Sequence, residues 1–478
     1  MRKLLILICL FATIGIARAQ RKDKPNVILI VMDDMGYSDT EPYGMTGIAT
    51  PHFNLLAKRG MRFTHYNVAE PICTASRAGI LTGCYPKRVG MSGALAPNAK
   101  MALNPDEQTI ASILKDNGYT TGMLGKWHLG GKPPYWPLHY GFDSYFGLPY
   151  SHDMSPMGST GHRVVNPKNM GPGHPFLPLI EGDKIVDSIS TMEQASQLTT
   201  MMTDKATAFI KQNKSKPFFL YLAHPLPHVP LAVSSKFKGK SGDMGIFGDV
   251  IMELDWSLGQ IMETLDKEKL ANNTLLIVTS DNGPWLTFGS NAGSPGGFRE
   301  GKMTTYDGGT RVPCYMRWPG KIEAGSVNSK LMVSIDLLPT IAAATGSQLP
   351  RKKIDGINFL PLLENKTQVP PREVFYYYYN RDDLQAVRYK NWKLVLPHKS
   401  LTNTMPGKGD MAGKTAMIDV PLALFDLAHD PGERYDVQEN YPEMVAKIQA
   451  LAQKAREDLG DDLTGVKGTG VRPSAQIR

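Results

Sequence analysis

Apolar runs alternate with segments of helical periodicity through the first two-thirds of the chain. Runs at residues 26–32, 217–223 and 274–279 have the length and continuity of strands that are buried on both faces. Between them, residues 109–117 and 250–265 carry apolar side chains at the spacing of a helix face. The alternation predicts an α/β fold in which helices sandwich a mostly parallel sheet.

The last quarter of the chain has a different pattern. Strand-like runs separated by turns occur at residues 375–379, 386–388, 392–396 and 424–427, and a helix pattern follows at 442–459. A loop rich in Pro, Asn and Lys precedes them at residues 364–371. We therefore predict a catalytic domain of residues 20–368 and a small C-terminal α+β subdomain of residues 369–478, with an antiparallel sheet and one helix.

The N-terminus has the features of a secretory signal peptide. Arg2 and Lys3 precede an uncharged, mostly apolar run of residues 4–16, and Ala17-Arg18-Ala19 provides a small-x-small cleavage site. The run is too short to span a bilayer; a single N-terminal anchor is the alternative. We predict that residues 1–19 are removed on export to the periplasm or the medium, or to a lysosome in a eukaryote. No later apolar stretch approaches membrane-span length, so no membrane insertion is expected.

Composition narrows the function only slightly. Hydrophobic residues make up 42% of the chain and charged residues 21%, which is ordinary for a soluble enzyme. Loss of three basic residues with the signal lowers the net charge from +8 to +5. Because the basic residues are scattered, without Lys/Arg runs, we expect no nucleic-acid partner. Sulfated and phosphorylated substrates fit this charge equally well.

The cysteine count indicates a special role for at least one thiol. Removal of the signal takes Cys9 away and leaves Cys73, Cys84 and Cys314. An odd number in an exported protein means that not every cysteine is in an intramolecular disulfide. The sequence leaves open whether Cys84 and Cys314 pair.

Two of the predicted buried strands end in acidic or amide side chains. Asp33 and Asp34 follow the first strand, and Asp281 and Asn282 follow the last. In open α/β sheets, ligands bind outside the carboxyl ends of the strands. Oxygen ligands favour calcium or magnesium over zinc, and carboxylates packed together without a cation would repel one another. The sequence therefore indicates a metal site; the alternative is that Asp33-Asp34 caps a helix or loop.

The segment Cys-Thr-Ala-Ser-Arg-Ala-Gly-Ile-Leu-Thr-Gly at residues 73–83 resembles the sulfatase signature, Cys-x-Pro/Ala-Ser-Arg followed by Leu-Thr-Gly. The resemblance implies an alkaline-phosphatase-like fold and hydrolysis of sulfate esters. It also implies that a formylglycine-generating maturation system oxidises Cys73 to the aldehyde formylglycine (3-oxoalanine). Ala75 replaces the commoner Pro, a substitution that the family tolerates.

The same resemblance implies one bound calcium ion. Its ligands would be the residues of the two acidic strand ends together with the modified cysteine: Asp33, Asp34, Asp281, Asn282 and Cys73. A hydrated aldehyde has two hydroxyls, one of which a divalent cation can acidify. Loss of the proton from the second hydroxyl would expel sulfate, whereas plain Ser or Cys would leave a stable sulfo-enzyme.

Three further motifs of the family occur in the expected order: Gly-Lys-Trp-His-Leu-Gly at 125–130, Pro-His-Val-Pro at 227–230 and Arg-Glu-Gly-Lys at 299–302. Lys126 and His128 are two residues apart, so on an extended segment their side chains would point the same way. The resemblance makes Lys126 and Lys302 sulfate contacts, with Arg77 as a third cation. It makes His128 a partner of the formylglycine hydroxyl, and His228 the proton donor to the leaving alcohol.

The Tyr-Ser-His-Asp stretch at residues 150–153 resembles arylsulfatase members of the family in which the Ser lies in the site. Ser151 and His152 are therefore candidate substrate-binding residues. The chain looks nearest to the arylsulfatase A and N-acetylgalactosamine-6-sulfatase branches, which favours a galactose or N-acetylgalactosamine sulfate as substrate. The alternatives are a phosphoester or phosphonate hydrolase of the same superfamily and a non-catalytic protein that binds sulfated glycans.

Overall fold

The computed structural model describes residues 24–158, 160–161 and 176–477. The predicted signal peptide and Cys9 lie outside the described residues. Among those residues, no helix combines the length and apolar character needed to cross a membrane.

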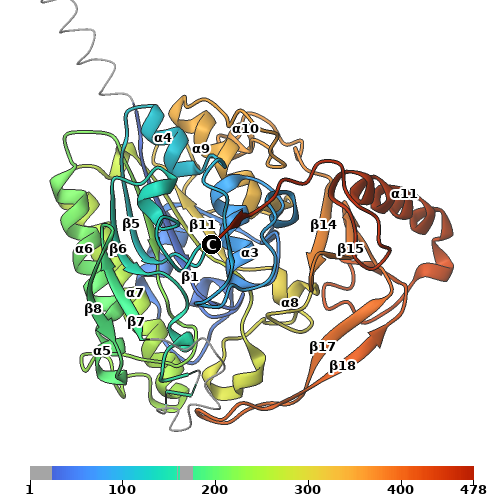
Figure 1. Ribbon diagram of the computed structural model, residues 1–478, viewed down its shortest axis with the longest axis horizontal. Helices are drawn as coiled ribbons and strands as arrows, with labels where there is room; N and C mark the ends of the chain where they lie inside the picture. The colour runs from blue at the N-terminus through green and yellow to red at the C-terminus, as the bar shows by residue number, and fades with distance from the viewer. Residues whose placement is uncertain (1–23, 159, 162–175, 478) are drawn as a thin grey trace, which may run out of the picture.

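A ten-stranded sheet forms the centre of the larger part of the molecule (Figure 1). Its central strands are parallel, and both edges include antiparallel pairs. In spatial order the strands are β12 (Ser326–Asn328), β2 (Met61–Phe63), β11 (Cys314–Arg317), β10 (Thr274–Ser280), β1 (Asn26–Met32), β9 (Phe218–Ala223), β5 (Thr120–Lys126), β6 (Ser144–Leu148), β7 (Leu177–Glu181) and β8 (Lys184–Ile189). The structure confirms the predicted α/β class and the three buried strands, which are β1, β9 and β10.

Helices cover both faces of this sheet because its strands are apolar on both sides. On β1, Val27, Leu29 and Val31 join one buried cluster, and Ile28 and Ile30 join the cluster on the opposite face. The first cluster includes residues of α3 (Cys73–Thr82), α4 (Ile110–Asp116), α9 (Leu337–Thr345) and α10 (Leu360–Leu363). The second includes residues of α2 (Pro51–Arg59), α5 (Met192–Ser196), α6 (Leu198–Gln212) and α7 (Gly245–Lys267).

The helices predicted at 109–117 and 250–265 are α4 and α7. The first begins where the sequence indicates. Thr109 caps it, because its hydroxyl accepts the backbone N–H of Ser112 while the Ser112 side chain accepts the N–H of Thr109.

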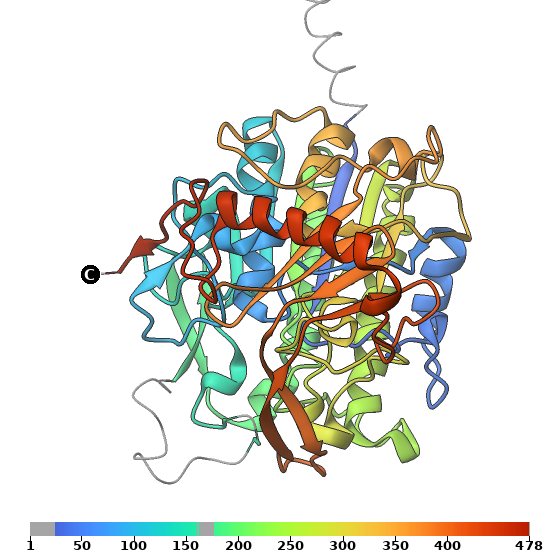
Figure 2. The same cartoon turned by 90° about the vertical axis from the view of Figure 1, so that its right-hand side faces the viewer.

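The C-terminal part is a four-stranded antiparallel sheet covered by one long helix, as predicted. Figure 2 shows α11 (Pro442–Leu459) lying across this sheet, with its apolar face in the same buried cluster as the strands. The sheet consists of β14 (Val374–Tyr379), β15 (Asp383–Tyr389), β16 (Trp392–Val395) and β19 (Ala423–Asp426).

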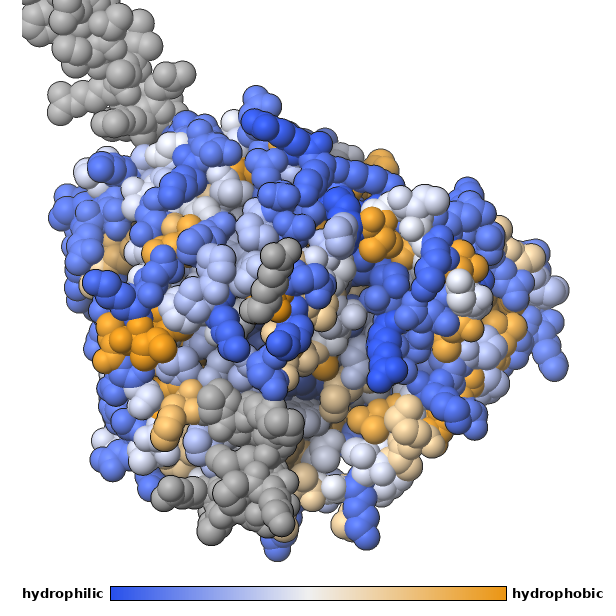
Figure 3. Space-filling model, in the orientation of Figure 1, coloured by the Kyte–Doolittle hydropathy of each residue, from blue (hydrophilic) through white to orange (hydrophobic). Residues whose placement is uncertain are grey.

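Several smaller elements were not predicted. A hairpin of β17 (His398–Met405) and β18 (Lys414–Val420) extends from the C-terminal sheet (Figure 1). The chain end returns to the larger part, where β20 (Ala475–Gln476) pairs with β4 (Met101–Ala102). A further pair joins β3 (Tyr66–Asn67) to β13 (Met332–Val333). Hydrophilic residues cover most of the face seen in Figure 3, with only separate apolar areas.

Candidate active site

Strand register brings the two acidic strand ends together. Met32 of β1 pairs with Ser280 of β10, so Asp33 and Asp281, the next residues of each strand, leave the sheet side by side. The backbone N–H of Asp34 donates to Asp281 Oδ1 at 3.1 Å, and Asn282 Nδ2 donates to Asp34 Oδ1 at 2.6 Å. All four predicted metal-binding side chains at these strand ends are buried.

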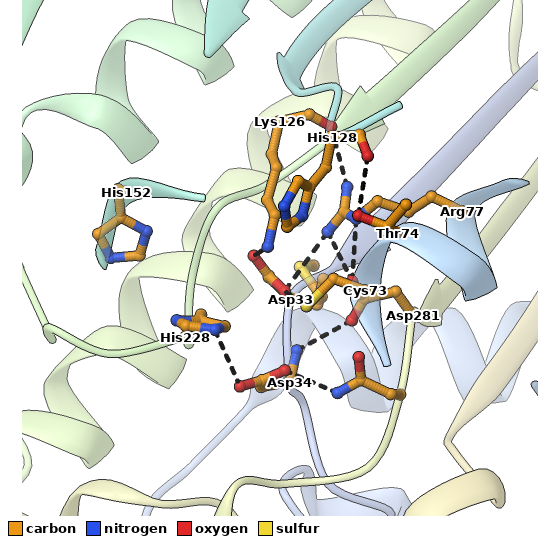
Figure 4. Close-up of polar contacts among 12 residues, drawn as sticks. Asp33, Asp34, Cys73, Thr74, Arg77, Lys126, His128, His152, His228 and Asp281 are labelled. Carbon is orange, nitrogen blue, oxygen red and sulfur yellow. Dashed lines mark hydrogen bonds and ion pairs between the residues drawn. The ribbon is translucent and has the colours of Figure 1, made fainter. Parts of the chain in front are cut away.

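Cys73 is the first residue of α3, and its side chain faces these strand ends (Figure 4). Ile72 before it is extended, with φ −157°, which starts the helix at the cysteine. Cys73 Sγ lies 3.5 Å from Asp33 Oδ1. Burial raises the pKa of the thiol to about 12 despite the nearby ammonium groups of Lys126 and Lys302, so the unmodified thiol stays protonated near neutral pH.

Three buried cations lie around Cys73. Arg77 Nε donates to Asp281 Oδ2 at 2.9 Å, Lys126 Nζ donates to Asp33 Oδ2 at 2.6 Å, and Lys302 Nζ lies 2.8 Å from Asp34 Oδ1. The cluster contains as many carboxylates as cations. Its cations are Arg77, Lys126 and Lys302, and its carboxylates are Asp33, Asp34 and Asp281. The cluster can therefore take up an anion and a divalent cation together while keeping its charge close to balance.

Protonation states follow from this pairing. Burial alone would raise the pKa of Asp33, but the positive charges of Lys126 and Arg77 hold that pKa well below its usual range. Burial and the neighbouring Asp33 raise the pKa of Asp281 to about 6, an effect that Arg77 opposes. Burial would lower the pKa of Lys302, but Asp34 more than offsets it and keeps the amine protonated.

His128 lies beyond the end of β5, so the alternation of side chains along a strand does not determine its orientation. β5 ends at Lys126, and His128 has φ +61°, a left-handed conformation that is uncommon for this residue. The two side chains nevertheless lie beside one another in Figure 4. The expected extended segment is therefore absent at His128, so strand alternation does not account for the placement of the two side chains.

The hydrogen bonds of His128 define its tautomer. Nε2 lies 2.9 Å from the carbonyl oxygen of Leu95, so Nε2 carries the proton. Burial and Lys126 hold the pKa of His128 well below its usual value, which keeps the ring neutral. Nδ1 is buried and has no hydrogen-bond partner among the described residues, so its lone pair is available to a group on Cys73.

His228 lies at the side of the cluster that is formed by Asp34. Its Nδ1 lies 2.5 Å from the carbonyl oxygen of Val229, and its Nε2 lies 3.6 Å from Asp34 Oδ2. The ring packs edge-on against His152, with centroids 5.7 Å apart, and lies 5.5 Å from the Trp285 ring. His224, which the family pattern did not select, points away from the cluster to the Ser257 hydroxyl at 3.2 Å.

The substrate-binding candidates lie in the segment after β6. Ser151 and His152 are both buried, and His152 Nε2 lies 3.0 Å from the carbonyl oxygen of Pro230. Burial and His228 lower the pKa of His152 to about 4, so it is neutral at physiological pH. In Figure 4, His152 lies farther from Cys73 than His228 does.

Sequence reasoning missed Trp285. The Lys302 ammonium lies 4.8 Å from the centre of its ring, and the His228 ring packs on another side. The tryptophan thus forms an apolar wall beside two candidate catalytic groups. Its position in the sequence could have suggested a role, because Trp285 follows the predicted metal ligand Asn282 by three residues.

Four side chains of the cluster lie close enough together to hold a metal ion. Ligand atoms of Asp33, Asp34, Cys73 and His228 all lie within 4.8 Å of one another. Asn282 Oδ1 is buried and has no hydrogen-bond partner among the described residues, which leaves it free to serve as a further ligand. Carboxylate and amide oxygens are the ligands that calcium and magnesium prefer. All three cysteines in the described residues are free, so Cys84 and Cys314 do not pair.

Comparison with known proteins places this chain in a family. The family profile described as Sulfatase matches residues 25–347, and the profile described as the C-terminal region of aryl-sulfatase matches residues 370–477. A further profile, N-sulphoglucosamine sulphohydrolase C-terminal, matches residues 297–404. The chain belongs to the sulfatase family, whose members hydrolyse sulfate esters, and its fold is alkaline-phosphatase-like.

The similarity to individual relatives extends over most of this chain and most of theirs. The chain is 36% identical to arylsulfatase A of Bos taurus, covering 90% of this chain and 86% of that protein. It is 32% identical to N-acetylgalactosamine-6-O-sulfatase of Bacteroides thetaiotaomicron, covering 91% and 94%. Among solved structures, the PsFucS1 sulfatase of Pseudoalteromonas sp. superposes with a TM-score of 0.80 at 27% identity, covering 93% of this chain and 92% of that one.

Proposed function

We propose that the protein removes sulfate from a sulfated carbohydrate, with formylglycine made from Cys73 as the nucleophile and calcium bound beside it. The observation that carries the proposal is the convergence of three buried cations on Cys73 at the start of α3. A sulfate ester carries one negative charge, and preorganised cations in a water-poor site stabilise the charge that develops as the ester bond breaks.

Within this proposal each side chain has a defined task. Lys126 and Lys302 contact the sulfate oxygens, and Arg77, held by Asp281, fixes the geometry at the helix start. His128 Nδ1 accepts a proton from the group on Cys73, because Nε2 is already committed to Leu95. When hydrated, the aldehyde supplies one hydroxyl for attack and a second whose deprotonation releases sulfate.

Asp33, Asp34, Asp281 and Asn282 would hold calcium, with the modified Cys73 as a further oxygen ligand. Bound there, the ion supplies charge that lowers the pKa of a neighbouring hydroxyl. The free oxygen of Asn282 and the all-oxygen character of the other strand-end donors support calcium over zinc.

Removal of the metal tests this assignment. Exhaustive chelation should abolish activity, and added calcium should restore it, while zinc should not. Elemental analysis of the active protein should give one calcium per chain. As a control, Asn282→Ala should weaken calcium binding, whereas Asn273→Ala, before β10, should not. Stoichiometric zinc, with zinc alone restoring activity, would contradict the proposal.

His228 is proposed as the general acid that protonates the leaving alcohol. Its Nδ1 donates to Val229, which leaves Nε2 facing the cluster. A sugar alkoxide is a strong base and needs this proton, whereas a nitrophenolate leaves with little help.

The substitution His228→Ala should therefore act selectively. We expect a loss of ~100-fold or more in kcat/KM on a sulfated sugar, and a much smaller loss on nitrophenyl sulfate. His224→Gln is the matched control: it removes a buried histidine that points to Ser257, so any effect should be equal on both substrates. Equal losses for His228→Ala would instead assign that residue a binding or structural role.

The carbohydrate substrate rests on the relatives. One relative is named N-acetylgalactosamine-6-O-sulfatase, which supports a galactose or N-acetylgalactosamine sulfate as the substrate. His152, whose ring packs against His228, and its neighbour Ser151 would then contact the sugar. We also propose that the segment 1–19 directs export, because it combines a basic start, an apolar run and a small-x-small cleavage site. We likewise propose that the catalytic domain ends at residue 368 and the C-terminal subdomain begins at residue 369.

Two other functions make different predictions. A phosphoester or phosphonate hydrolase would turn over phosphate or phosphonate esters faster than sulfate esters. A non-catalytic glycan binder would show no turnover, yet every catalytic position carries a competent side chain. Assaying matured enzyme on a panel of sulfated mono- and oligosaccharides, alongside phosphate and phosphonate esters, decides among the three.

A further inference from the structure

A cavity of about 700 Å³ lies between the larger part of the molecule and the C-terminal sheet. None of the proposed catalytic or metal-binding residues lines it. Its walls include six basic or potentially basic side chains: His65, Arg311, Lys330, Arg372, Arg388 and Lys390. Glu373 is the single acidic residue in the lining that the structure describes. Such a surplus of positive groups suits an anion.

Arg388 of β15 is the unusual member of this set. Its side chain is only 2% exposed. Nε donates to the carbonyl oxygen of Lys390 at 2.6 Å, but Nη1 is buried without a hydrogen-bond partner, and no ion pair joins Arg388 to a described carboxylate. A buried guanidinium without a paired carboxylate is costly, because burial removes its water and a single hydrogen bond to a carbonyl oxygen replaces only part of it.

Neighbouring carboxylates do not supply the missing partner. Asp307 of α8 (Asp307–Thr310) is committed to Arg311 at 3.2 Å and to Lys393 at 3.4 Å. Glu433 is committed to Lys393, with Nζ and Oε1 2.7 Å apart. Arg311, Lys393 and Arg388 therefore share two carboxylates, and one positive charge is left over at the wall to which Arg388 belongs.

Among the other basic groups of the cavity, Lys330 adds to this surplus of positive charge. Lys330 is half-buried, and no ion pair involves it among the described residues. Arg372 is fully engaged by Asp336, and Lys390 pairs with Glu373 at 3.2 Å. Burial, with Arg311 and Arg388 nearby, lowers the pKa of His65 to about 3, so His65 contributes hydrogen bonds and no charge.

We propose that this cavity is an oxyanion-binding site in which Arg388 and Lys330 hold a sulfate group. A guanidinium presents N–H donors in a planar fork that matches two oxygens of a tetrahedral anion, and a lysine adds a mobile point charge. The group has two sources: inorganic sulfate, or a sulfate ester on another unit of a polysulfated carbohydrate. The second source rests on the proposed function.

Binding is tested directly with selenate, a tetrahedral dianion that anomalous scattering can locate. Crystals of the full chain soaked in selenate should show a peak beside Arg388 and Lys330. In solution, millimolar sulfate should raise the Tm of the wild type. Lys330→Ala should lose at least half of that rise, while Lys454→Ala, which removes an exposed lysine of α11, should keep it. Arg388→Lys is a second variant: it keeps a positive charge but removes the planar fork of N–H donors, so it should also lose part of the rise in Tm.

Two further arms identify the source and separate this site from the catalytic one. Inactive Cys73→Ser protein with a sulfated oligosaccharide should bind more weakly after Lys330→Ala if the group is a sulfate ester, and equally well if the ligand is inorganic sulfate. Lys330→Ala should leave kcat/KM on nitrophenyl sulfate unchanged, because Lys330 is not among the proposed catalytic residues. The selenate and Tm measurements need no turnover, so they test the cavity even if the proposed function fails. The absence of a selenate peak, together with equal sulfate-induced Tm shifts in the wild type and Lys330→Ala, overturns the proposal.

Discussion

Replacing Cys73 by alanine or serine is expected to abolish turnover of sulfate esters, with a loss of at least about four orders of magnitude in kcat. Neither side chain can be converted to formylglycine in a host whose maturation system requires cysteine. Serine retains one hydroxyl, but a sulfate ester formed on it has no second hydroxyl through which to expel sulfate. The unmodified thiol offers no alternative route, since burial keeps it protonated.

The fold should survive this substitution, which makes the result interpretable. Cys73 Sγ has one weak contact, 3.5 Å from Asp33 Oδ1, and serine is nearly isosteric with cysteine. Thermal unfolding of Cys73→Ser should therefore resemble that of the wild type, and the protein should still bind calcium and substrate. Mass spectrometry of the peptide that contains Cys73 should show the aldehyde in active wild-type protein. Cys84→Ser is the control, because Cys84 is a buried free thiol that does not face the cluster.

Wild-type kcat in Cys73→Ser or Cys73→Ala, measured with a sulfate ester, would rule out the formylglycine mechanism. The phosphoesterase-like alternative, with another nucleophile, would then become the leading explanation of the site.

Removal of the Lys302 ammonium should produce the second large effect. Lys302→Ala is expected to lower kcat/KM by about a hundredfold or more, which corresponds to about 3 kcal/mol of lost transition-state stabilisation. The amine is buried beside Asp34 and Trp285, where a low dielectric strengthens its attraction for the developing charge. Steady-state kinetics on correctly folded, calcium-loaded variant would measure the loss.

A control is needed because Lys302 also neutralises Asp34. Calcium content and Tm should be measured for each variant, so that a lost ion or a destabilised fold is not counted as lost catalysis. Lys302→Arg, which keeps the charge, should recover part of the activity. Lys267→Ala, which removes an exposed lysine of α7, should change nothing. A change within twofold for a calcium-loaded Lys302→Ala protein would place Lys302 outside the catalytic machinery.

Strong local patterns made much of the fold predictable. The continuous apolar run of β1 and the helical stripe of α7 are buried in the central part, and the turns of the C-terminal part separate β14, β15, β16 and β19 as expected. The hairpin β17–β18 escaped prediction because most of its residues are partly or fully exposed and lack an apolar alternation. The edge strand β8 and its neighbour β7 depend on pairing with adjacent strands rather than on their own composition.

The residue types of the site were also readable from the sequence, because family motifs fix them at Cys73, Lys126, His228 and Lys302. Their roles remain proposals until the variants are measured. Motifs could not supply the conformation of His128, whose left-handed backbone is imposed by the segment after β5. Nor could they supply Trp285, since only the folded chain brings its ring against Lys302 and His228.

The sequence alone therefore determined the layer architecture, the nucleophile candidate and the set of charged groups, since these depend on local periodicity and on short motifs. Only the tertiary structure decided which charges balance one another. Asp33 and Asp281 meet because β1 and β10 pair in register, although the two residues are far apart in the chain. Likewise, Arg388 lacks a carboxylate partner because Asp307 and Glu433 are already engaged by other cations, a consequence of packing that no stretch of sequence records.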